Sequence, residues 1–307
     1  MVLVAGEALI DIISNNKKGN NAELIPGGSG FNVACALGNL EVDTSFLYPL
    51  SSDPMGDLLL DKLNTYKVNY ALTERLDLPT PLAFVSIQGN NPSYHFYRKG
   101  TVDGELNRFD YHKYLEQDVK IIHLTGFTLN NSDDFKLWYK FASIAKELGC
   151  LISLDPNVRP PAIKNYDLYR EQIWKLIELS DVVKMSDEDL TFIAPDIAIS
   201  DAQKLVAENT TLSVVTSGLG GSDIIFCNDL IHIDTISQIN YVDSVGAGDC
   251  YSAGYIKQIM SLGVFDLASL KSVSKEQVRK IFNFASTNAS INCAKRGCQP
   301  PSINMHN

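Results

Sequence analysis

From residue 119 onward, short apolar runs alternate with segments of helical period. Runs such as "VKIIHLTGF" and "CLISLDPN" have the length of buried strands. The segment between them, "DDFKLWYKFASIAKEL", has the spacing of an amphipathic helix. Parallel strands need a crossover connection, which is usually a helix. The alternation therefore predicts an α/β fold with a mostly parallel sheet covered by helices, whose ligands bind at the carboxyl ends of the strands.

The first hundred residues contain two features that do not fit this alternation. The N-terminal run "VLVAGEALIDII" predicts a buried first strand, followed by a polar turn and the short strand "AELI". Between residues 81 and 98, two extended runs flank a Gly-Asn-Asn-Pro turn, which is a hairpin signal. We expect a single domain over 1–307 with a small β-sheet lid, formed by about residues 11–29 and 79–107 and inserted in the α/β core.

Composition excludes several classes of function. A formal charge of −10 argues against a nucleic-acid partner or an anionic membrane, since both need a basic face. The chain has no run of 18 apolar residues, and its apolar N-terminus carries two acidic residues and no basic leader. The six cysteines are scattered without a CxxC pair, which favours reduced thiols over disulfides or a zinc site. We expect a cytoplasmic protein.

The stretch 239–254, "INYVDSVGAGDCYSAG", places a carboxylate at a tight glycine turn that opens a helix. Glycine leaves backbone N–H groups unscreened, and a helix start adds unpaired donors and the positive end of a dipole. Gly246, Ala247 and Gly248 are therefore a candidate anion hole. Asp249 beside it could take a proton from an alcohol that attacks a bound phosphate. The alternative is an ordinary strand-to-helix turn with an acidic first turn.

Further segments contain candidate ligand contacts. The glycine pair Gly27-Gly28 leads into a helix that carries Asn32, and such a turn permits close approach of a small ligand. Asp11 sits where an apolar strand ends, and its carboxylate could accept from sugar hydroxyls. Arg159, in "LDPNVRP", is a candidate phosphate clamp, although an arginine in a loop is often a solvated surface charge.

Together these segments resemble the ribokinase-like (phosphofructokinase-B-type) carbohydrate kinases. "DSVGAGD" is similar to that family's "DTxGAGD" signature, and "GGSGFNVA" to its sugar-binding glycine motif. The resemblance covers the chain in order and implies a three-layer α/β/α core with a β lid. It also implies ATP-dependent phosphorylation of a sugar hydroxyl assisted by Mg²⁺.

Residue by residue, the resemblance assigns the base to Asp249 and sugar contacts to Asp11, Gly28 and Asn32. Its nucleotide-binding positions are Thr216, Gly218 and Gly221, with Gly246 and Gly248 contributing from the anion hole. The loop "INCAKRGCQPPS" is similar to one that borders the adenine and, in some members, a monovalent cation. Asp243 is the candidate ligand of such a cation, which would be K⁺.

Two positions depart from the family pattern. The metal-associated NxxE appears here as Ser186-Asp187-Glu188-Asp189, which leaves Asp189 as the candidate Mg²⁺ ligand. An asparagine often found in the adenine-side helix is replaced by Ser286, which is the candidate nucleotide contact there.

The same segments point to the fructokinase branch, since Ser29 follows the glycine pair where a ribokinase typically has lysine. Arg98 matches a lid arginine in fructokinase-like members and would neutralise the transferred phosphoryl group or the product phosphate. Two alternatives stay open: a kinase for another small substrate, such as 2-keto-3-deoxygluconate or an aminoimidazole riboside, and a non-catalytic binding relative. Asp249 argues against the second, because a binding module has no use for a base. The lid hairpins could also pair two subunits into a homodimer.

Overall fold

The larger of two sheets in the computed structural model has nine strands in the order β13-β12-β11-β10-β9-β8-β1-β4-β5. The structure describes residues 1–14, 21–88, 91–116, 118–126, 132–236 and 240–306. The nine strands are β1 (Val2–Ala5), β4 (Thr44–Phe46), β5 (Asn69–Tyr70), β8 (Ile121–Thr125), β9 (Leu151–Asp155), β10 (Val182–Ser186), β11 (Leu212–Thr216), β12 (Ser222–Phe226) and β13 (Asp229–Ile233).

In this order every neighbouring pair from β11 across to β5 is parallel, and only the pairs β11–β12 and β12–β13 are antiparallel. All residues of β1, β8 and β9 are buried, as expected for strands that are covered on both faces. The mostly parallel sheet that the alternating sequence predicts is confirmed. The antiparallel edge follows from the short turn at Cys227 and Asn228, because two strands joined by so few residues can only form a hairpin.

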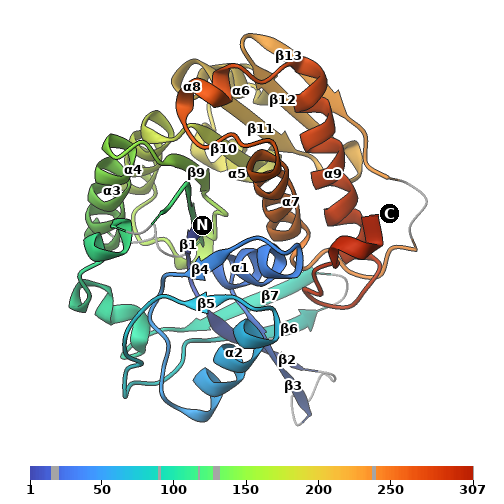
Figure 1. Cartoon of the computed structure of the whole chain (residues 1–307). Helices are drawn as coiled ribbons and strands as arrows, with labels where there is room; N and C mark the ends of the chain where they lie inside the picture. The colour runs from blue at the N-terminus through green and yellow to red at the C-terminus, as the bar shows by residue number, and fades with distance from the viewer. Residues whose placement is uncertain (15–20, 89–90, 117, 127–131, 237–239, 307) are drawn as a thin grey trace.

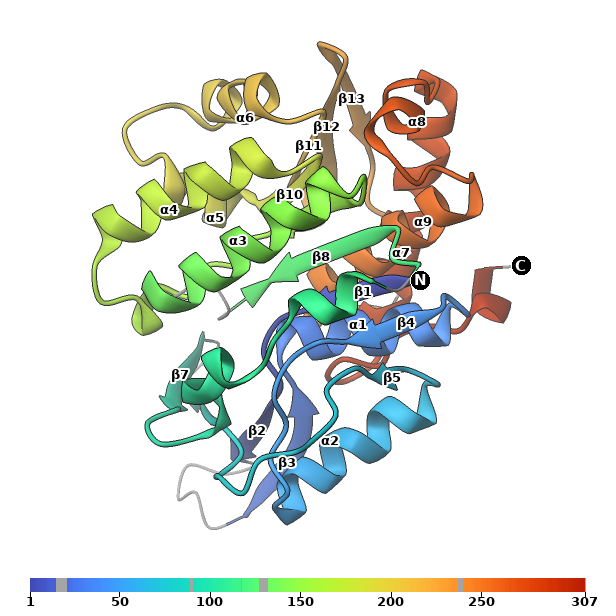
Figure 2. The same ribbon diagram turned by 60° about the vertical axis from the view of Figure 1, so that its left-hand side comes forward.

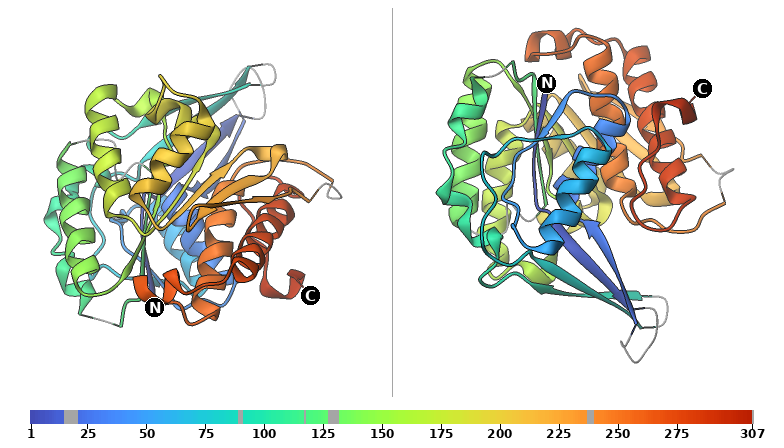
Figure 3. Two further views of the ribbon diagram at one scale, coloured as in Figure 1. Left: turned by 90° about the horizontal axis from the view of Figure 1, so that it is seen from above. Right: turned by 60° about the horizontal axis from the view of Figure 1, so that its bottom comes forward.

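Helices cover both faces of the large sheet and complete three layers (Figure 1). Seen from above in Figure 3, α3, α4 and α6 lie on one side of the sheet, and α7 and α9 on the other. Helix α1 packs beside α7 on the second face. The helices are α1 (Ser29–Asn39), α2 (Pro54–Thr65), α3 (Ser132–Glu147), α4 (Tyr166–Leu179), α5 (Asp187–Ile193), α6 (Ile199–Asn209), α7 (Ala247–Ser261), α8 (Leu267–Lys271) and α9 (Lys275–Cys293).

The second sheet has four strands in the order β3-β2-β6-β7 and projects from one end of the molecule (Figure 2). Its strands are β2 (Leu9–Ser14), β3 (Ala22–Gly27), β6 (Leu82–Gln88) and β7 (Asn91–Tyr97). The two predicted hairpins therefore join, through a parallel pairing of β2 with β6. Residues 102–107 of the expected lid belong instead to a 3₁₀ helix, η1 (Val102–Arg108). Whether this sheet acts as a lid stays a prediction.

The prediction of one N-terminal strand is wrong, because "VLVAGEALIDII" is divided between the two sheets. Its first half is β1 in the large sheet and its second half is β2 in the small one. The break falls where Gly6 passes so close to Gly30 that a Cβ atom on either glycine would overlap the other's backbone. The buried Glu7 follows and binds the start of α1. An apolar run does not reveal such a break, since both halves are buried.

The chain crosses from one half of the large sheet to the other at β1. It runs from β1 to β4 and β5 on one side, and returns to β8, β9, β10 and β11 on the other. In open α/β sheets, ligands bind outside the carboxyl ends of the strands at such a switch point. The further short helices are η2 (His112–Leu115), η4 (Pro160–Ala162), η5 (Gly218–Gly220) and η6 (Ile303–His306). None of the helices in the described part of the chain is long and apolar enough to cross a membrane.

Candidate active site

Asp249 is buried in the first turn of α7, and its two carboxylate oxygens are held by two side chains of α1. Ser29 Oγ donates to Oδ1 at 2.8 Å, and Asn32 Nδ2 donates to Oδ2 at 2.9 Å. The helix begins directly after Gly246, whose φ of 76° lies in the left-handed region that favours glycine. The starts of two helices from distant parts of the chain therefore meet at this carboxylate.

Burial raises the pKa of Asp249 to about 6, although the hydrogen bonds from Asn32 and Ser29 lower it. A carboxyl group with such a pKa is mostly ionised at neutral pH and still basic enough to accept a proton. General bases are most efficient when their pKa lies near the working pH. The geometry and the titration of Asp249 both suit proton abstraction.

A buried ion pair lies directly behind the glycine turn. Lys184 Nζ donates to Asp155 Oδ2 at 2.8 Å, and the two side chains are 5% and 2% exposed. A Cβ atom on Gly248 would come within 2.9 Å of the Lys184 ammonium, so this charge sits against the backbone of the turn. Burial lowers the pKa of Lys184, but its pairing with Asp155 raises it above the ordinary value. Lys184 therefore stays charged and adds positive potential to the start of α7.

The glycine turn itself presents fewer backbone donors than the sequence suggests. The N–H of Ala247 bonds to the carbonyl of Ser244 at 3.0 Å. The N–H groups of Gly248 and Asp249, in the first turn of α7, have no acceptor within the helix because of their position. They are the better candidates for an oxyanion. Gly246 is packed so tightly that a Cβ atom there would lie 2.5 Å from Cys298 Cβ and Sγ.

Asp11 lies within strand β2 and not at the end of a strand, which corrects the interpretation from the sequence. It pairs with Ile25 and Ala83 in the small sheet. A Cβ atom on Gly27 would come within 2.5 Å of Asp11 Oδ2, so the absence of a side chain at Gly27 leaves room for this carboxylate.

The charges around Asp11 show which residues share its surroundings. Burial and the nearby Glu7 raise the pKa of Asp11 to about 7, whereas Arg159 and Lys62 lower it and Asp249 raises it. The fold thus brings Asp11, Arg159 and Asp249 within electrostatic range, although more than 80 residues separate them in sequence. Arg159 itself is exposed and, within the described part of the chain, its side chain donates only to the carbonyl of Val158, at 3.1 Å.

Gly28 and Asn32 shape the same region. Gly28 has a φ of 105° as the residue before α1, and a Cβ atom on it would overlap the carbonyl of Glu7. Asn32 donates from its amide nitrogen to Asp249, while its buried Oδ1 has no hydrogen-bond partner among the residues that the structure describes. A buried acceptor without a partner costs free energy unless a ligand supplies a donor. Asn32 Oδ1 is therefore suited to receive a substrate hydroxyl.

Arg98 directly follows β7 and forms an ion pair between its Nε and Oδ2 of the buried Asp103. Tyr48 donates to the other oxygen of Asp103, at 3.2 Å. Arg98 thus has a structural partner in η1. Its role toward a phosphoryl group stays a prediction. The charge of Glu7, which directly follows the break after β1, also raises the pKa of Arg98. Arg98 is therefore within electrostatic range of the switch point.

The candidate nucleotide contacts are linked through the segment after β13. Thr216 ends β11, Gly218 begins η5 and Gly221 directly follows it. Thr235 Oγ1 donates to the carbonyl of Gly218 at 2.8 Å, and Ser286 Oγ donates to the carbonyl of Asp234 at 3.1 Å. The loop after β11 and helix α9 are therefore joined by residues 234 and 235. The single hydroxyl proton of Ser286 is donated to the carbonyl of Asp234.

The two candidate metal ligands have structural partners. Asp189 forms a capping box with Ser186, and its oxygens accept from the N–H groups of Val158 at 2.8 Å and Ser186 at 3.0 Å. Asp243 accepts from the N–H groups of Val245 at 3.0 Å and Gly297 at 2.9 Å, which ties the C-terminal loop to the turn before α7. Within the described residues, no group of three or more His, Cys, Asp or Glu side chains could hold a metal ion.

The structural roles of several residues at the site were not predicted from the sequence: Glu7, Ser29, Thr125 and Lys184. One of them had a signal, since a lysine inside the apolar strand "DVVKMS" needs a buried counter-charge. The strand-end aspartate of "LDPNVRP" is that counter-charge. Ser29 and Thr125 had no such signal, because serine and threonine occur at many helix starts and strand ends.

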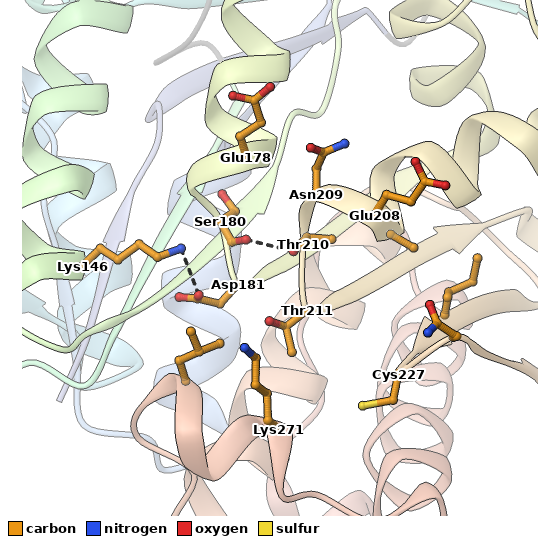
Figure 4. A pocket seen from close by; sticks show the side chains of 14 residues that line it. Lys146, Glu178, Ser180, Asp181, Glu208, Asn209, Thr210, Thr211, Cys227 and Lys271 are labelled. Atoms are coloured by element: carbon orange, nitrogen blue, oxygen red, sulfur yellow. Dashed lines mark hydrogen bonds and ion pairs between the residues drawn. The ribbon is translucent and has the colours of Figure 1, made fainter.

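A separate depression lies at the edge of the large sheet where β10 and β11 begin, opposite the edge that carries Asp249. Figure 4 shows the side chains that line it. It is lined by residues that precede β10 and β11, among them Ser180, Asp181, Thr210 and Thr211. Lys146 and Asp181 form an ion pair there, at 3.1 Å. None of the predicted site residues borders it.

Comparisons with known proteins identify the family of this chain. A family model described as pfkB family carbohydrate kinase matches residues 1–305. The fructokinase of Rhizobium leguminosarum bv. trifolii is 29% identical over 285 residues, covering 91% of this chain and 86% of that protein. The probable fructokinase-2 of Arabidopsis thaliana is 28% identical over 309 residues, covering 98% of this chain and 92% of that protein.

Among solved structures, a fructokinase with bound ATP from Xylella fastidiosa matches with a TM-score of 0.88 at 25% identity, covering 97% of this chain and 93% of that one. The predicted ribokinase-like fold is confirmed, and the chain belongs to the pfkB family of carbohydrate kinases.

Proposed function

We propose that this protein is an ATP-dependent fructokinase, which converts D-fructose and ATP to D-fructose 6-phosphate and ADP. The observation that carries the proposal is the buried carboxylate of Asp249 at the start of α7, held by Ser29 and Asn32. A base beside backbone donors is what phosphoryl transfer to a hydroxyl requires. The similarity to fructokinases over almost the whole chain supports fructose as the acceptor.

In the proposed reaction the sugar hydroxyl oxygen attacks the γ-phosphorus, the bond to the β–γ bridging oxygen breaks, and Asp249 takes the hydroxyl proton. The N–H groups of Gly248 and Asp249 and the charge of Lys184 would stabilise the negative charge on the phosphoryl oxygens. Asp11 and the unpartnered Oδ1 of Asn32 would hold sugar hydroxyls in position.

On the nucleotide side, Thr216, Gly218 and Gly221 would line the ATP site, with Ser286 bordering it. The phosphate contacts would come from Arg98 and Arg159. Arg159 is exposed and acts electrostatically on Asp11, which supports a place beside the substrate.

Mg²⁺ would enter with ATP, coordinated mainly by the nucleotide phosphates and water, as is usual for this ion. Asp189 does not fit a protein-built Mg²⁺ site, because its carboxylate is buried and both oxygens already accept backbone N–H groups, whereas Asp243 is only half-buried. K⁺ is proposed at Asp243, where each carboxylate oxygen accepts one N–H and keeps a further lone pair. ADP release measured in K⁺ and in tetramethylammonium buffer tests this assignment.

The experiment that tests the function is coupled ADP release with a panel of ketoses, aldoses and nucleosides. D-fructose should give the highest kcat/KM. A preference for 2-keto-3-deoxygluconate or an aminoimidazole riboside would keep the reaction and change the substrate. The absence of ADP release with every acceptor, from a folded protein that still binds ATP, would favour the non-catalytic alternative.

We also propose that the small sheet is a mobile lid and that it can pair two subunits. Its outer strands carry exposed apolar side chains, including Leu24 and Tyr97, which are 45% and 61% exposed. Apolar side chains on open strand edges favour pairing with another chain. Sedimentation analysis at micromolar concentration tests the homodimer, and cell fractionation tests the cytoplasmic location proposed with it.

A further inference from the structure

Ser29 is the first residue of α1 and is fixed at both its backbone and its side chain. Its backbone N–H donates to Glu7 Oε1 at 2.9 Å. Its Oγ lies 2.8 Å from Asp249 Oδ1 and 2.7 Å from Thr125 Oγ1. The residue is 4% exposed. Three elements, the end of β8, the start of α1 and the start of α7, therefore meet at one hydroxyl.

The direction of these hydrogen bonds follows from the charge of Asp249. An ionised carboxylate only accepts, so the single hydroxyl proton of Ser29 points to Asp249 Oδ1. Ser29 Oγ is then free to accept, and Thr125 must be the donor in the contact between the two hydroxyls. The result is an ordered series from Thr125 to Ser29 to Asp249, in which each hydrogen bond polarises and strengthens the next.

We propose that Ser29 is a positioning residue for Asp249, which holds the carboxylate in one orientation and in its ionised form, with Thr125 orienting the Ser29 hydroxyl. Ser29 acts through Asp249 and needs no contact with the reacting atoms. The inference rests on the proposed function, in which Asp249 is the base. It goes beyond that function because it names what keeps the base competent.

The other charged groups that face Asp249 are separable from this effect. Asp155 from β9 raises the pKa of Asp249 and Lys184 from β10 lowers it. Asp11, in the small sheet, is within electrostatic range as well. Substituting Ser29 by alanine leaves all of these charges and the bond from Asn32 in place. A change in the titration of Asp249 in that variant is then traceable to the lost hydroxyl.

The first test is the pH profile of kcat/KM with D-fructose and ATP for Ser29→Ala. Loss of one hydrogen bond to the ionised form should move the acid limb upward by about 0.5 to 1 pH unit. Activity below the limb should fall about 3- to 10-fold relative to the wild type, while activity well above it stays within about threefold. Thr125→Val should move the limb in the same direction by less. An unmoved limb, or an equal loss at every pH, would reduce Ser29 to a packing role and overturn the inference.

A matched control is Ser180→Ala. Ser180 is also a buried serine, but it donates to the carbonyl of Leu176 at the opposite edge of the sheet. Its pH profile should coincide with that of the wild type. A limb that moves in this control as it does in Ser29→Ala would trace the change to general loosening of the fold and count against the inference.

A second readout does not depend on activity. In protein labelled with ¹³C at the aspartate carboxyl carbons, the Asp249 signal is identified by its absence from Asp249→Asn, and its titration in Ser29→Ala should move upward as the acid limb does. If Asp249→Asn keeps its turnover, the base of the proposed function is wrong. If Asp249→Asn is inactive but Ser29→Ala titrates like the wild type, the proposed function stands and only the role of Ser29 fails.

Discussion

Arg98 and Asp103 form an ion pair across the turn that follows β7, with Asp103 only 4% exposed and Arg98 21% exposed at their side chains. Tyr48 donates to the same carboxylate. A residue expected to serve the phosphoryl group is therefore also the counter-charge of a buried aspartate. A single substitution of Arg98 changes both roles at once, so the two must be separated by design.

Arg98→Ala should destabilise the fold by about 3–5 kcal/mol, because it leaves the Asp103 charge buried without its cationic partner. The double variant Arg98→Ala, Asp103→Ala should recover most of this free energy of unfolding, measured by urea denaturation. If Arg98 serves the transferred phosphoryl group, the double variant keeps its sugar KM and loses at least about tenfold in kcat. Wild-type turnover in the double variant would leave Arg98 with the structural role alone.

Asp249→Asn preserves the shape of the side chain and removes the proton acceptor. We expect turnover to fall by about 10²- to 10⁴-fold, the usual contribution of acid–base catalysis. ATP affinity measured by calorimetry should change only a few-fold, since the backbone donors of the α7 start remain. Turnover within about tenfold of the wild type, in a folded variant, would remove Asp249 from the role of base.

Asp11→Asn should stabilise the sugar-free protein at high pH. The pKa of Asp11 is raised by burial to about 7 in the folded state, against a value of 3.8 for the free side chain. Between these values the folded state binds more protons than the unfolded state, so the Asp11 carboxylate lowers the free energy of unfolding as pH rises through that window. Because Asp11 is partly exposed, we expect a gain of about 1–3 kcal/mol for the variant at pH 8.5, vanishing near pH 4.

The same variant should weaken fructose binding by about 1–3 kcal/mol, because one charged acceptor oxygen is replaced by an amide N–H donor. Urea denaturation at several pH values gives the first quantity and calorimetry gives the second. A stability difference that does not vary with pH would contradict the raised pKa. Equal losses of affinity for sugar and for ATP would contradict a sugar contact.

Gly246→Ala should destabilise the protein by about 2–4 kcal/mol, through left-handed backbone strain and overlap with Cys298. The displaced turn should also raise the KM for ATP more than the KM for fructose. Gly104→Ala is the matched control, because its Cβ atom would meet nothing within 4 Å. Comparable denaturation midpoints for the two variants would show that the packing of Gly246 against Cys298 does not constrain the turn.

The small sheet should respond to sugar more than the large one. Fructose bound by Asp11 would favour a closed arrangement of β3-β2-β6-β7, so hydrogen exchange in these four strands should slow when fructose is added. Strand β11, which ends at Thr216, should change far less and serves as the internal reference. Equal slowing in both sheets would indicate global stabilisation by the ligand, and no slowing would indicate a pocket formed without lid movement.

The amino-acid sequence by itself determined the type of fold and the position of the candidate base. Strands that are buried on both faces appear in the sequence as continuous apolar runs, and the helices between them keep a 3.6-residue period. The order of these segments therefore predicts a parallel sheet. The turn at Gly246 and the acid at Asp249 are also local features, since a left-handed glycine and a first-turn carboxylate depend only on neighbouring residues.

Only the tertiary structure decided where the N-terminal run divides and which side chains meet at Asp249. Both halves of that run are buried, so hydrophobicity cannot mark the break at Gly6; the close packing against Gly30 does. For the same reason Asp11 was expected at a strand end and lies within β2. Ser29 and Thr125 are 96 residues apart, yet their hydroxyls lie 2.7 Å from each other. Such contacts depend on how β8, α1 and α7 pack against one another. The residues next to Ser29 or Thr125 in the sequence do not indicate which distant side chain will lie beside it.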